Sequence, residues 1–247
     1  MNIRELIDKV TDSAKSYPTT TFSLENNGHI NTCINPYSYH IIKRFPELYS
    51  PMDGLFIDGM IMCWLIRILW NKKIPRLSFD MSGMAIDLFS RINCNPNESI
   101  YFIGAKANEI EQSISQIQKA YPTMNIVGYR HGFFSSEMER LNVIEKIIQL
   151  NPSFVVIGMG APIQEKFAID LKQSGYKGNA FTCGGFLHQT KDRLNYYPKW
   201  INKYNLRAFY RLSKEKGLFK RLYFVLLQFP IRFVIDTITY RFKKVLP

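Results

Sequence analysis

Short apolar runs alternate with longer amphipathic segments along most of this chain. The apolar runs predict buried strands, and apolar residues at helical spacing predict helices. Strands that alternate with helices of about 10–15 residues indicate a mainly parallel sheet covered by helices on both faces. Strands are expected at 29–34, 55–57, 76–79, 99–103, 124–127, 154–157 and 179–182, and helices at 3–16, 36–45, 60–70, 81–92, 107–121, 136–150, 162–173 and 200–212.

The stretch 154–165 contains the most informative junction of the predicted sheet. Its apolar first half predicts a strand, Gly158 and Gly160 break that strand, and the proline that follows is suited to the first position of a helix. In such sheets the ligand site is the crevice at the carboxyl ends of the strands, where glycine turns and helix N-termini accept an anion. Gln164 and Glu165 fall in the first turn of the helix, close to such a ligand. An ordinary strand–helix junction has the same pattern.

Two further polar elements follow predicted strands at the same edge of the sheet. Asp58, directly before Gly59, can reach the crevice and act as a general base on a substrate hydroxyl. An aspartate before glycine is also typical of a turn or a helix cap. His131, before Gly132, is either a polar residue of the site or an exposed loop histidine.

Later residues offer contacts for an anionic ligand. Gly184 and Gly185 follow the last predicted strand and allow either close backbone approach to a ligand or only a tight turn. Arg193, Arg207 and Arg211 are suited to clamping phosphate, and solvation at the surface is the alternative. The sequence contains no Asp-x-Asp element, Walker motif or serine nucleophile elbow, so it gives no sign of a bound metal or cofactor.

Composition supports one large α/β domain or one domain with an appendage. Hydrophobic residues make up 46% of the 247 positions, which is enough for a packed core. The four cysteines are scattered without metal-ligand spacing, which favours reduced thiols in the cytoplasm. The N-terminus is charged and lacks the apolar core of a signal peptide.

The net charge of +12 is concentrated at the C-terminus. Residues 199–247 hold 12 Lys and Arg against 2 Asp and Glu, a balance of +10, so the rest of the chain holds 20 against 18, a balance of +2. Such asymmetry indicates an anionic partner for the tail. We therefore divide the chain into an α/β body, residues 1–190, and a basic helical appendage, residues 191–247.

The tail also has an apolar helical face. Only ten uncharged residues lie between Arg221 and Arg232, whereas a helix that crosses a bilayer needs roughly 20. Basic residues beside an apolar segment fit a helix in the membrane interface, and a helical hairpin packed on the body is the alternative. A nucleic acid partner is disfavoured because the charge accompanies a continuous aliphatic face. The residues of that face are Leu218, Leu222, Val225, Leu226 and Phe229.

A series of short motifs runs in a fixed order from about Asn31 to Leu212, and it resembles the WecG/TagA/CpsF family of glycosyltransferases. The most specific motif is Gly-x-Gly-x-Pro-x-Gln-Glu, at Gly158 to Glu165. The other matches are Cys33-Ile34-Asn35 with Thr32 beside it, Asp58-Gly59 before an apolar helix, Tyr101 to Gly104, Tyr121-Pro122, Gly128, His131 to Phe134, Gly184-Gly185 with Arg193, Pro198 and Trp200, and Tyr210-Arg211-Leu212.

The resemblance implies an inverting transferase that moves a hexosyl or N-acetylhexosaminyl-type sugar from a UDP-sugar to a polyprenyl-diphosphate-linked saccharide. It implies a Rossmann-like body, a basic appendage that reaches an anionic membrane surface on the cytoplasmic side, and no metal requirement. Asp58 becomes the proposed base, and Gln164 holds the nucleotide-sugar or the acceptor. Substrate contacts are expected at Thr32, Asn35, Gly59, Gly104, His131, Gly132, Gly158, Gly160, Gln164, Glu165, Gly184, Gly185, Arg193 and Arg211.

Some positions depart from the family pattern. Cys33 stands where threonine is usual, Phe79 where glycine is usual, and Leu187-His188 where an apolar residue precedes aspartate. These differences leave the identity of sugar and acceptor open. Two other readings remain: a catalytically inactive membrane adaptor with the same fold, and a nicotinamide-dependent oxidoreductase, which would need a third glycine in the motif.

Overall fold

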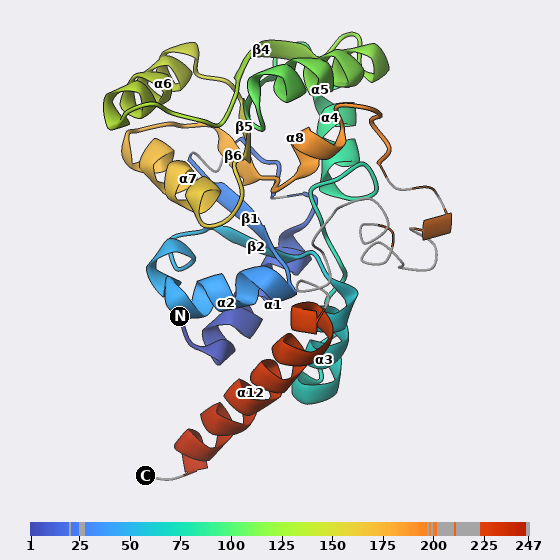
Figure 1. Ribbon diagram of the computed structural model, residues 1–247, viewed down its shortest axis with the longest axis vertical. Helices are drawn as coiled ribbons and strands as arrows, with labels where there is room; N and C mark the ends of the chain where they lie inside the picture. The colour runs from blue at the N-terminus through green and yellow to red at the C-terminus, as the bar shows by residue number, and fades with distance from the viewer. Residues whose placement is uncertain are drawn as a thin grey trace.

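A six-stranded parallel sheet forms the centre of the protein (Figure 1). The structure is a computed structural model that describes residues 1–19, 21–24, 28–196, 198, 200–201, 210 and 223–245. All strand pairs are parallel, in the order β2-β1-β6-β5-β3-β4, which confirms the predicted α/β fold. The strands are β1 Ile30–Ile34, β2 Gly54–Ile57, β3 Ser99–Gly104, β4 Asn125–Arg130, β5 Phe154–Gly158 and β6 Asn179–Thr182.

Helices cover both faces of the sheet, and each face has its own buried apolar cluster. Alternate residues of one strand point to opposite faces, so Val155 of β5 joins one cluster and Val156 joins the other. Helices α1 Ile3–Ser16, α2 Pro36–Arg44, α3 Met60–Trp70, α6 Glu137–Leu150, α7 Ile163–Gln173 and α12 Phe229–Val245 contribute to the first cluster, and α4 Met84–Cys94, α5 Ala107–Ala120 and α8 Phe186–Gln189 to the second. Two short turns, the 3-10 helix η1 Pro46–Leu48 and the π-helix η2 Phe224–Gln228, complete the described elements.

The strand predicted at 76–79 is wrong. This segment lies beside β2 but makes a single backbone hydrogen bond to it, from Leu77 N to Ile57 O at 2.9 Å. The side chains of Arg76 and Ser78 instead turn together and hydrogen-bond to each other, at 2.7 Å. Contacts among polar side chains thus hold this segment, in place of the strand hydrogen bonds that its alternating polar and apolar residues predicted.

Two helices begin later than predicted. The carboxylate of Asp80 accepts hydrogen bonds from the backbone and the hydroxyl of Ser82, and this turn delays α4 until Met84 instead of Met81. In α7 the first helical residue is Ile163, and Pro162 occupies the cap position. The predicted helix 200–212 falls mostly outside the described residues.

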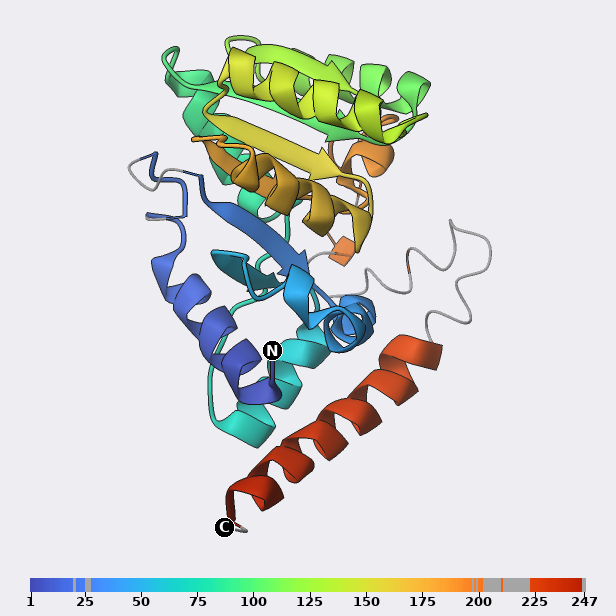
Figure 2. The ribbon, with the colours of Figure 1, turned by 90° about the vertical axis from the view of Figure 1, so that its left-hand side faces the viewer.

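The C-terminal helix α12 is docked on the body of the protein (Figure 2). Phe229 and Phe233 are fully buried, and their rings lie 5.4 and 5.5 Å from the ring of Tyr39 in α2. The Tyr39 hydroxyl donates to Asp236 at 2.6 Å, and the Lys43 ammonium lies 3.2 Å from the same carboxylate. Phe229 therefore faces the body, so its predicted place on a membrane-facing surface is wrong. Leu218 and Leu222 of that predicted surface lie outside the described residues.

A second apolar face of α12 is exposed. Ile231, Ile235, Ile238 and Phe242 recur every three or four residues, so they share one side of the helix, and each is 46–65% exposed. The buried Phe229 and Phe233 lie on the opposite side. No helix among the described residues is long and apolar enough to cross a membrane. We call the exposed set Ile231, Ile235, Ile238 and Phe242 the outer face of α12.

We predict that Phe233→Ala weakens the docking of α12. Removal of a buried phenylalanine leaves a cavity and costs about 3–5 kcal/mol of the free energy of unfolding. Phe242→Ala is the matched control, because Phe242 is 65% exposed on the same helix and its loss should change stability by no more than about 0.5 kcal/mol. Urea denaturation and the rate of tryptic cleavage in the tail measure the difference. Equal effects of the two substitutions would contradict this packing.

Candidate active site

A partly buried arginine holds the proposed base at the carboxyl end of β2. One Arg76 guanidinium nitrogen lies 2.7 Å from Asp58 Oδ1 and 3.3 Å from Asp80 Oδ2. The Arg76 side chain is 16% exposed and the Asp58 side chain 39%, so the carboxylate faces solvent and the arginine supports it from behind. Burial opposes the charge of Arg76, but the two carboxylates outweigh burial and raise its pKa. Asp58 therefore sits at the crevice with a fixed orientation.

The neighbouring candidates Asn35 and Gly59 start the helices that flank Asp58. The Asn35 side chain accepts hydrogen bonds from the backbone N–H groups of Tyr37 and Ser38 and so caps α2. At Gly59 a Cβ atom would lie 2.9 Å from the ring of Pro36, so only glycine lets α2 and α3 start this close together. Both residues shape the edge of the crevice.

Three of the candidate glycines pack against one another. A Cβ atom on Gly104 would overlap the backbone of Gly158, and one on Gly132 would lie 2.9 Å from the side chain of Met159 and 3.0 Å from Gly104 Cα. Ala105 N donates to Gly158 O at 3.0 Å within the same contact. These glycines therefore let the ends of β3, β4 and β5 converge.

Gly160 and Gly184 are different, because they face open space. Each has a positive φ, +79° and +55°, and a Cβ on either would meet no atom within 4 Å. Gly185 is nearly as open, with the Gln189 amide nitrogen as its first neighbour at 3.6 Å. The turns after β5 and β6 thus present bare backbone at the crevice, where an anionic ligand can approach closely.

The side chains of Gln164, Glu165 and Thr32 form a buried network beneath these two turns. Gln164 Oε1 accepts from Gly160 N at 3.2 Å and from Gly184 N at 3.1 Å, and Gln164 Nε2 donates to Glu165 Oε1 at 2.9 Å. The Thr32 hydroxyl donates to the same Glu165 oxygen at 2.9 Å. All three side chains are at most 4% exposed, so they support the turns from inside. Substrate contact by these side chains stays a prediction.

Burial raises the pKa of Glu165, although the hydrogen bonds from Gln164 and Thr32 oppose the shift. Its second oxygen, Oε2, is buried and has no hydrogen-bond partner among the described residues. The Thr32 hydroxyl lies 2.6 Å from the Thr182 hydroxyl of β6. The network therefore joins α7 to strands β1 and β6 through side chains alone.

The remaining candidates lie further out. His131 Nδ1 accepts from the backbone N–H of Phe133 at 3.3 Å, which closes a turn after β4. Arg193 is exposed in the segment after α8, and Arg207 and Arg211 lie outside the described residues. The structure thus gathers Asp58, Asn35 and the open glycine turns at one edge, with His131 at the end of β4.

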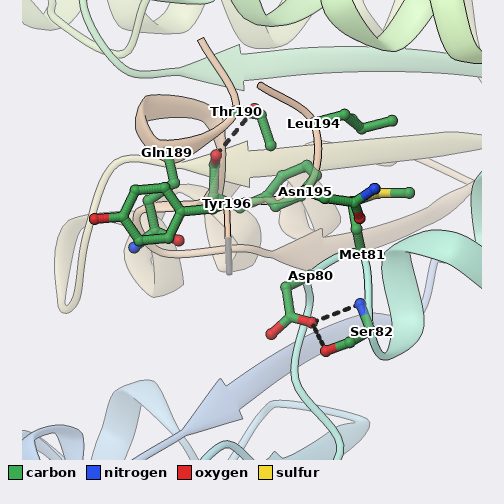
Figure 3. A pocket seen from close by; sticks show the side chains of 9 residues that line it. Asp80, Met81, Ser82, Gln189, Thr190, Leu194, Asn195 and Tyr196 are labelled. Carbon is green, nitrogen blue, oxygen red and sulfur yellow. Dashed lines mark hydrogen bonds between the residues drawn. The ribbon is translucent and has the colours of Figure 1, made fainter. Parts of the chain in front are cut away.

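A small pocket opens between the turn that follows Arg76 and the segment after α8 (Figure 3). Its volume of about 20 Å³ is enough for one water molecule. Asp80 and Ser82 form one wall, and Gln189, Asn195 and Tyr196 lie across from them (Figure 3). The pocket marks the side of the crevice that faces α8.

Sequence reasoning missed two charged groups at this edge. Arg76 is the first. Arg76, Ser78 and Asp80 occupy alternate positions, which puts three polar side chains on one side of an extended segment, and this pattern was the signal for a polar cluster. Glu109 is the second: its carboxylate is buried, 2.9 Å from His188 Nδ1 and 3.0 Å from Lys191 Nζ. Burial raises the pKa of Glu109, but the hydrogen bonds from His188 and Lys191 prevail and bring it to about 2. His188, which departs from the family pattern, thus anchors α8 to α5.

Among the described residues, no three His, Cys, Asp or Glu side chains gather in a way that would hold a metal ion.

Comparison with known proteins identifies the family. The profile of the glycosyl transferase WecG/TagA/CpsF family matches residues 4–243, which is nearly the whole chain. The chain belongs to the WecG/TagA/CpsF family of glycosyltransferases. This membership confirms the resemblance carried by the sequence motifs and favours a transferase over the adaptor and the oxidoreductase.

Three relatives of this transferase show what similar chains do. A UDP-Gal:alpha-D-GlcNAc-diphosphoundecaprenol beta-1,4-galactosyltransferase of Shigella boydii is 35% identical over 213 residues, 86% of this chain and 89% of the relative. Two N-acetylglucosaminyldiphosphoundecaprenol N-acetyl-beta-D-mannosaminyltransferases are more distant. The enzyme of Bacillus subtilis (strain 168) is 26% identical over 201 residues, 79% of this chain and 75% of the relative. That of Bacillus spizizenii is 22% identical over 226 residues, 90% and 85% of the two chains.

We predict that Glu109→Gln makes the stability of this transferase less dependent on pH in the acid range. Because folding lowers the pKa of Glu109 from 4.5 to about 2, its ion pairs stabilise the fold above about pH 4.5, and this stabilisation is lost as pH falls toward 2. The free energy of unfolding of the variant should therefore fall less steeply than that of the wild type between these pH values. Glu111→Gln, exposed on the same helix, should follow the wild type. If the free energy of unfolding of Glu109→Gln fell with pH as steeply as that of the wild type, the stabilising role of the Glu109 ion pairs would be refuted.

Proposed function

We propose that this glycosyltransferase moves a sugar from a UDP-sugar to a saccharide on polyprenyl diphosphate, with inversion and without a metal ion. The observation that carries the proposal is the Asp58 carboxylate, half exposed at the crevice and held by Arg76. The relatives support the substrate class, because the names of all three describe a sugar transferred to an acceptor on diphosphoundecaprenol. The galactosyltransferase of Shigella boydii is named with UDP-Gal as donor.

Asp58 acts as the general base in a single displacement. The acceptor oxygen attacks the anomeric carbon of the donor while its proton moves to the carboxylate. The bond from that carbon to the β-phosphate oxygen breaks, and its electron pair leaves with UDP. Arg76 bonds to Oδ1, so Oδ2 is the oxygen that takes the proton. General-base assistance of this kind typically contributes about 10²–10⁴-fold to the rate.

The leaving diphosphate lies over the turns at Gly160 and Gly184. These turns expose backbone without side chains. The helices that follow the strands begin at the same edge of the sheet, and their N-termini stabilise negative charge there. Arg193 and Arg211 supply further positive charge for the leaving diphosphate. The nucleotide-sugar thus occupies the side of the crevice toward α8, and the body 1–190 carries out the chemistry.

The appendage 191–247 brings this body to the cytoplasmic face of the membrane. The outer face of α12 supplies apolar side chains, and Arg232, Arg241 and Lys243 beside it are exposed. A helix with this pattern inserts its apolar side into the interface, while basic residues near an anionic surface contribute roughly 1 kcal/mol each. Peripheral binding at the membrane would place the crevice near a lipid-linked acceptor.

We predict that Asp58→Asn lowers kcat by about 10²–10⁴-fold, because the amide cannot take the proton of the acceptor hydroxyl. The KM values should change little, since asparagine keeps the size and position of the side chain. Asp12→Asn, 73% exposed on α1, is the control and should retain full activity. The assay follows transfer from UDP-sugars to the lipid-linked acceptor by mass spectrometry, first with chelator and then with added metal. Activity of Asp58→Asn within a few-fold of wild type would remove Asp58 from this role.

We predict that changing Ile231, Ile235 and Ile238 together to Gln weakens membrane binding at least roughly tenfold. These side chains are exposed, so the fold should persist, and the binding that remains should come from basic residues and disappear in high salt. Leu150→Gln, 40% exposed at the end of α6, is the control. Flotation with vesicles that contain anionic lipid measures the effect. Unchanged flotation of the triple variant would show that the outer face does not touch the bilayer.

A further inference from the structure

An apolar groove of about 450 Å³ lies on the side of the glycine turns away from α8. Its lining residues come from the end of α2 and η1, the start of α6, and the first turns of α7; Figure 1 shows the positions of α2, α6 and α7. The volume is that of a site for a small molecule or part of a chain. The Phe134 and Phe167 rings stack at 5.9 Å and 13° and form a flat part of its wall. The apolar lining includes Phe45, Leu48, Phe134, Met159, Ile163 and Phe167.

Exposed apolar side chains lie at this groove or next in sequence to residues that line it. Ile163 is 60% exposed at the first position of α7, Phe133 is 62% exposed in the turn after β4, and Met138 is 66% exposed at the start of α6. Such a cluster beside an apolar groove marks a binding surface. All three residues stand at the carboxyl edge of the sheet, as does Asp58.

The spacing of the strands relates the groove to the proposed base. Asp58 follows β2 and Met159 follows β5, and these strands are three steps apart in the sheet. Neighbouring strands lie about 4.8 Å apart, so the two positions are separated by roughly 14 Å across the sheet. A sugar ring followed by a diphosphate covers a distance of this order. A chain linked to that diphosphate would therefore enter the groove when the sugar hydroxyl is at Asp58.

The charges around the groove fit the same ligand. Two of its polar residues, Glu137 and Arg140, pair with each other, and Arg140 also lies 2.5 Å from Asp170. Lys166, exposed at the groove, forms no ion pair within the described part of the chain. The two cations and the carboxylates of Glu137 and Asp170 balance in charge, so Lys166 contributes an exposed ammonium that can contact a diphosphate attached to an apolar chain.

The geometry points to this groove as the binding site for the first isoprenoid units of the lipid-linked acceptor, with Lys166 at its diphosphate. The inference rests on the proposed function for its substrate class. It assigns acceptor and donor to opposite sides of the glycine turns: the acceptor chain enters past Met159 and Ile163, and the nucleotide lies toward α8. Affinity for the acceptor then depends on the chain as well as on the saccharide.

The first experiment compares two acceptors that carry the same saccharide diphosphate, one on a long polyprenyl chain and one on a short water-soluble alkyl chain. Ile163→Gln should raise KM for the polyprenyl acceptor roughly tenfold in detergent, because it loses apolar contact with the chain. It should leave KM for the short acceptor within about twofold of wild type. Ile86→Gln, 41% exposed on α4 at the other face of the sheet, should change neither value. Equal KM shifts for both acceptors, or no shift, would overturn the inference.

A second experiment does not depend on activity. A polyprenyl diphosphate with a photoreactive group in its first isoprenoid units is cross-linked to the full-length protein, and labelled peptides are identified by mass spectrometry. Label should fall on residues 133–140 and 159–167, and unlabelled polyprenyl diphosphate should displace it while phospholipid should not. Label elsewhere, or displacement by phospholipid alone, would refute the groove. Label in the groove without transfer to either acceptor would instead sink the proposed function.

Discussion

The crevice depends on one buried amide group. Gln164 Oε1 accepts hydrogen bonds from the turns after two neighbouring strands, at Gly160 and Gly184, and Gln164 Nε2 is held in turn by Glu165. Because a buried polar group without its partner is costly, the amide fixes both turns at the same time. Thr32 extends this constraint to β1, the strand that leads to the cap of α2. The open backbone at the crevice is thus held in place by the hydrogen bonds that Gln164 accepts from both turns.

This constraint explains why the site is divided into regions. The glycines at the ends of β3, β4 and β5 pack closely against one another, whereas Gly160 and Gly184 face open space. The region toward α8 contains polar side chains, among them Asp80, which accepts a hydrogen bond from Arg76. The region toward α2 and α6 is apolar. The substrates of the proposed reaction would differ in the same way: the donor consists of sugar, phosphates and nucleoside, and the acceptor carries an apolar isoprenoid chain.

Local patterns in the sequence predicted the parallel sheet, the glycine turns and the position of Asp58 at a strand end. They were misleading at 76–79, where alternating residues suggested a strand but Arg76 bonds to Asp58, 18 residues earlier. They also did not reveal that Thr32 meets Glu165, 133 residues later, because such pairs exist only in the folded chain. In α12 both sides of the helix are apolar, so periodicity alone does not determine which side faces the body, and Phe229 was placed on the wrong one.

Charge compensation links the tail to the chemistry. Asp58 and Arg76 neutralise each other, and the chain before residue 199 has a balance of only +2, so the crevice has little positive charge of its own for two diphosphates. The excess of +10 lies in residues 199–247. Electrostatic attraction in salt extends about 8 Å, so these charges act only if the tail is held near the crevice. The packing of Phe224 on Tyr37 and His40 fixes one point of the tail, because Tyr37 belongs to the first turn of α2, beside the Asn35 cap. In the function proposed above, a tail fixed at that point would connect attachment to the membrane with neutralisation of the substrates.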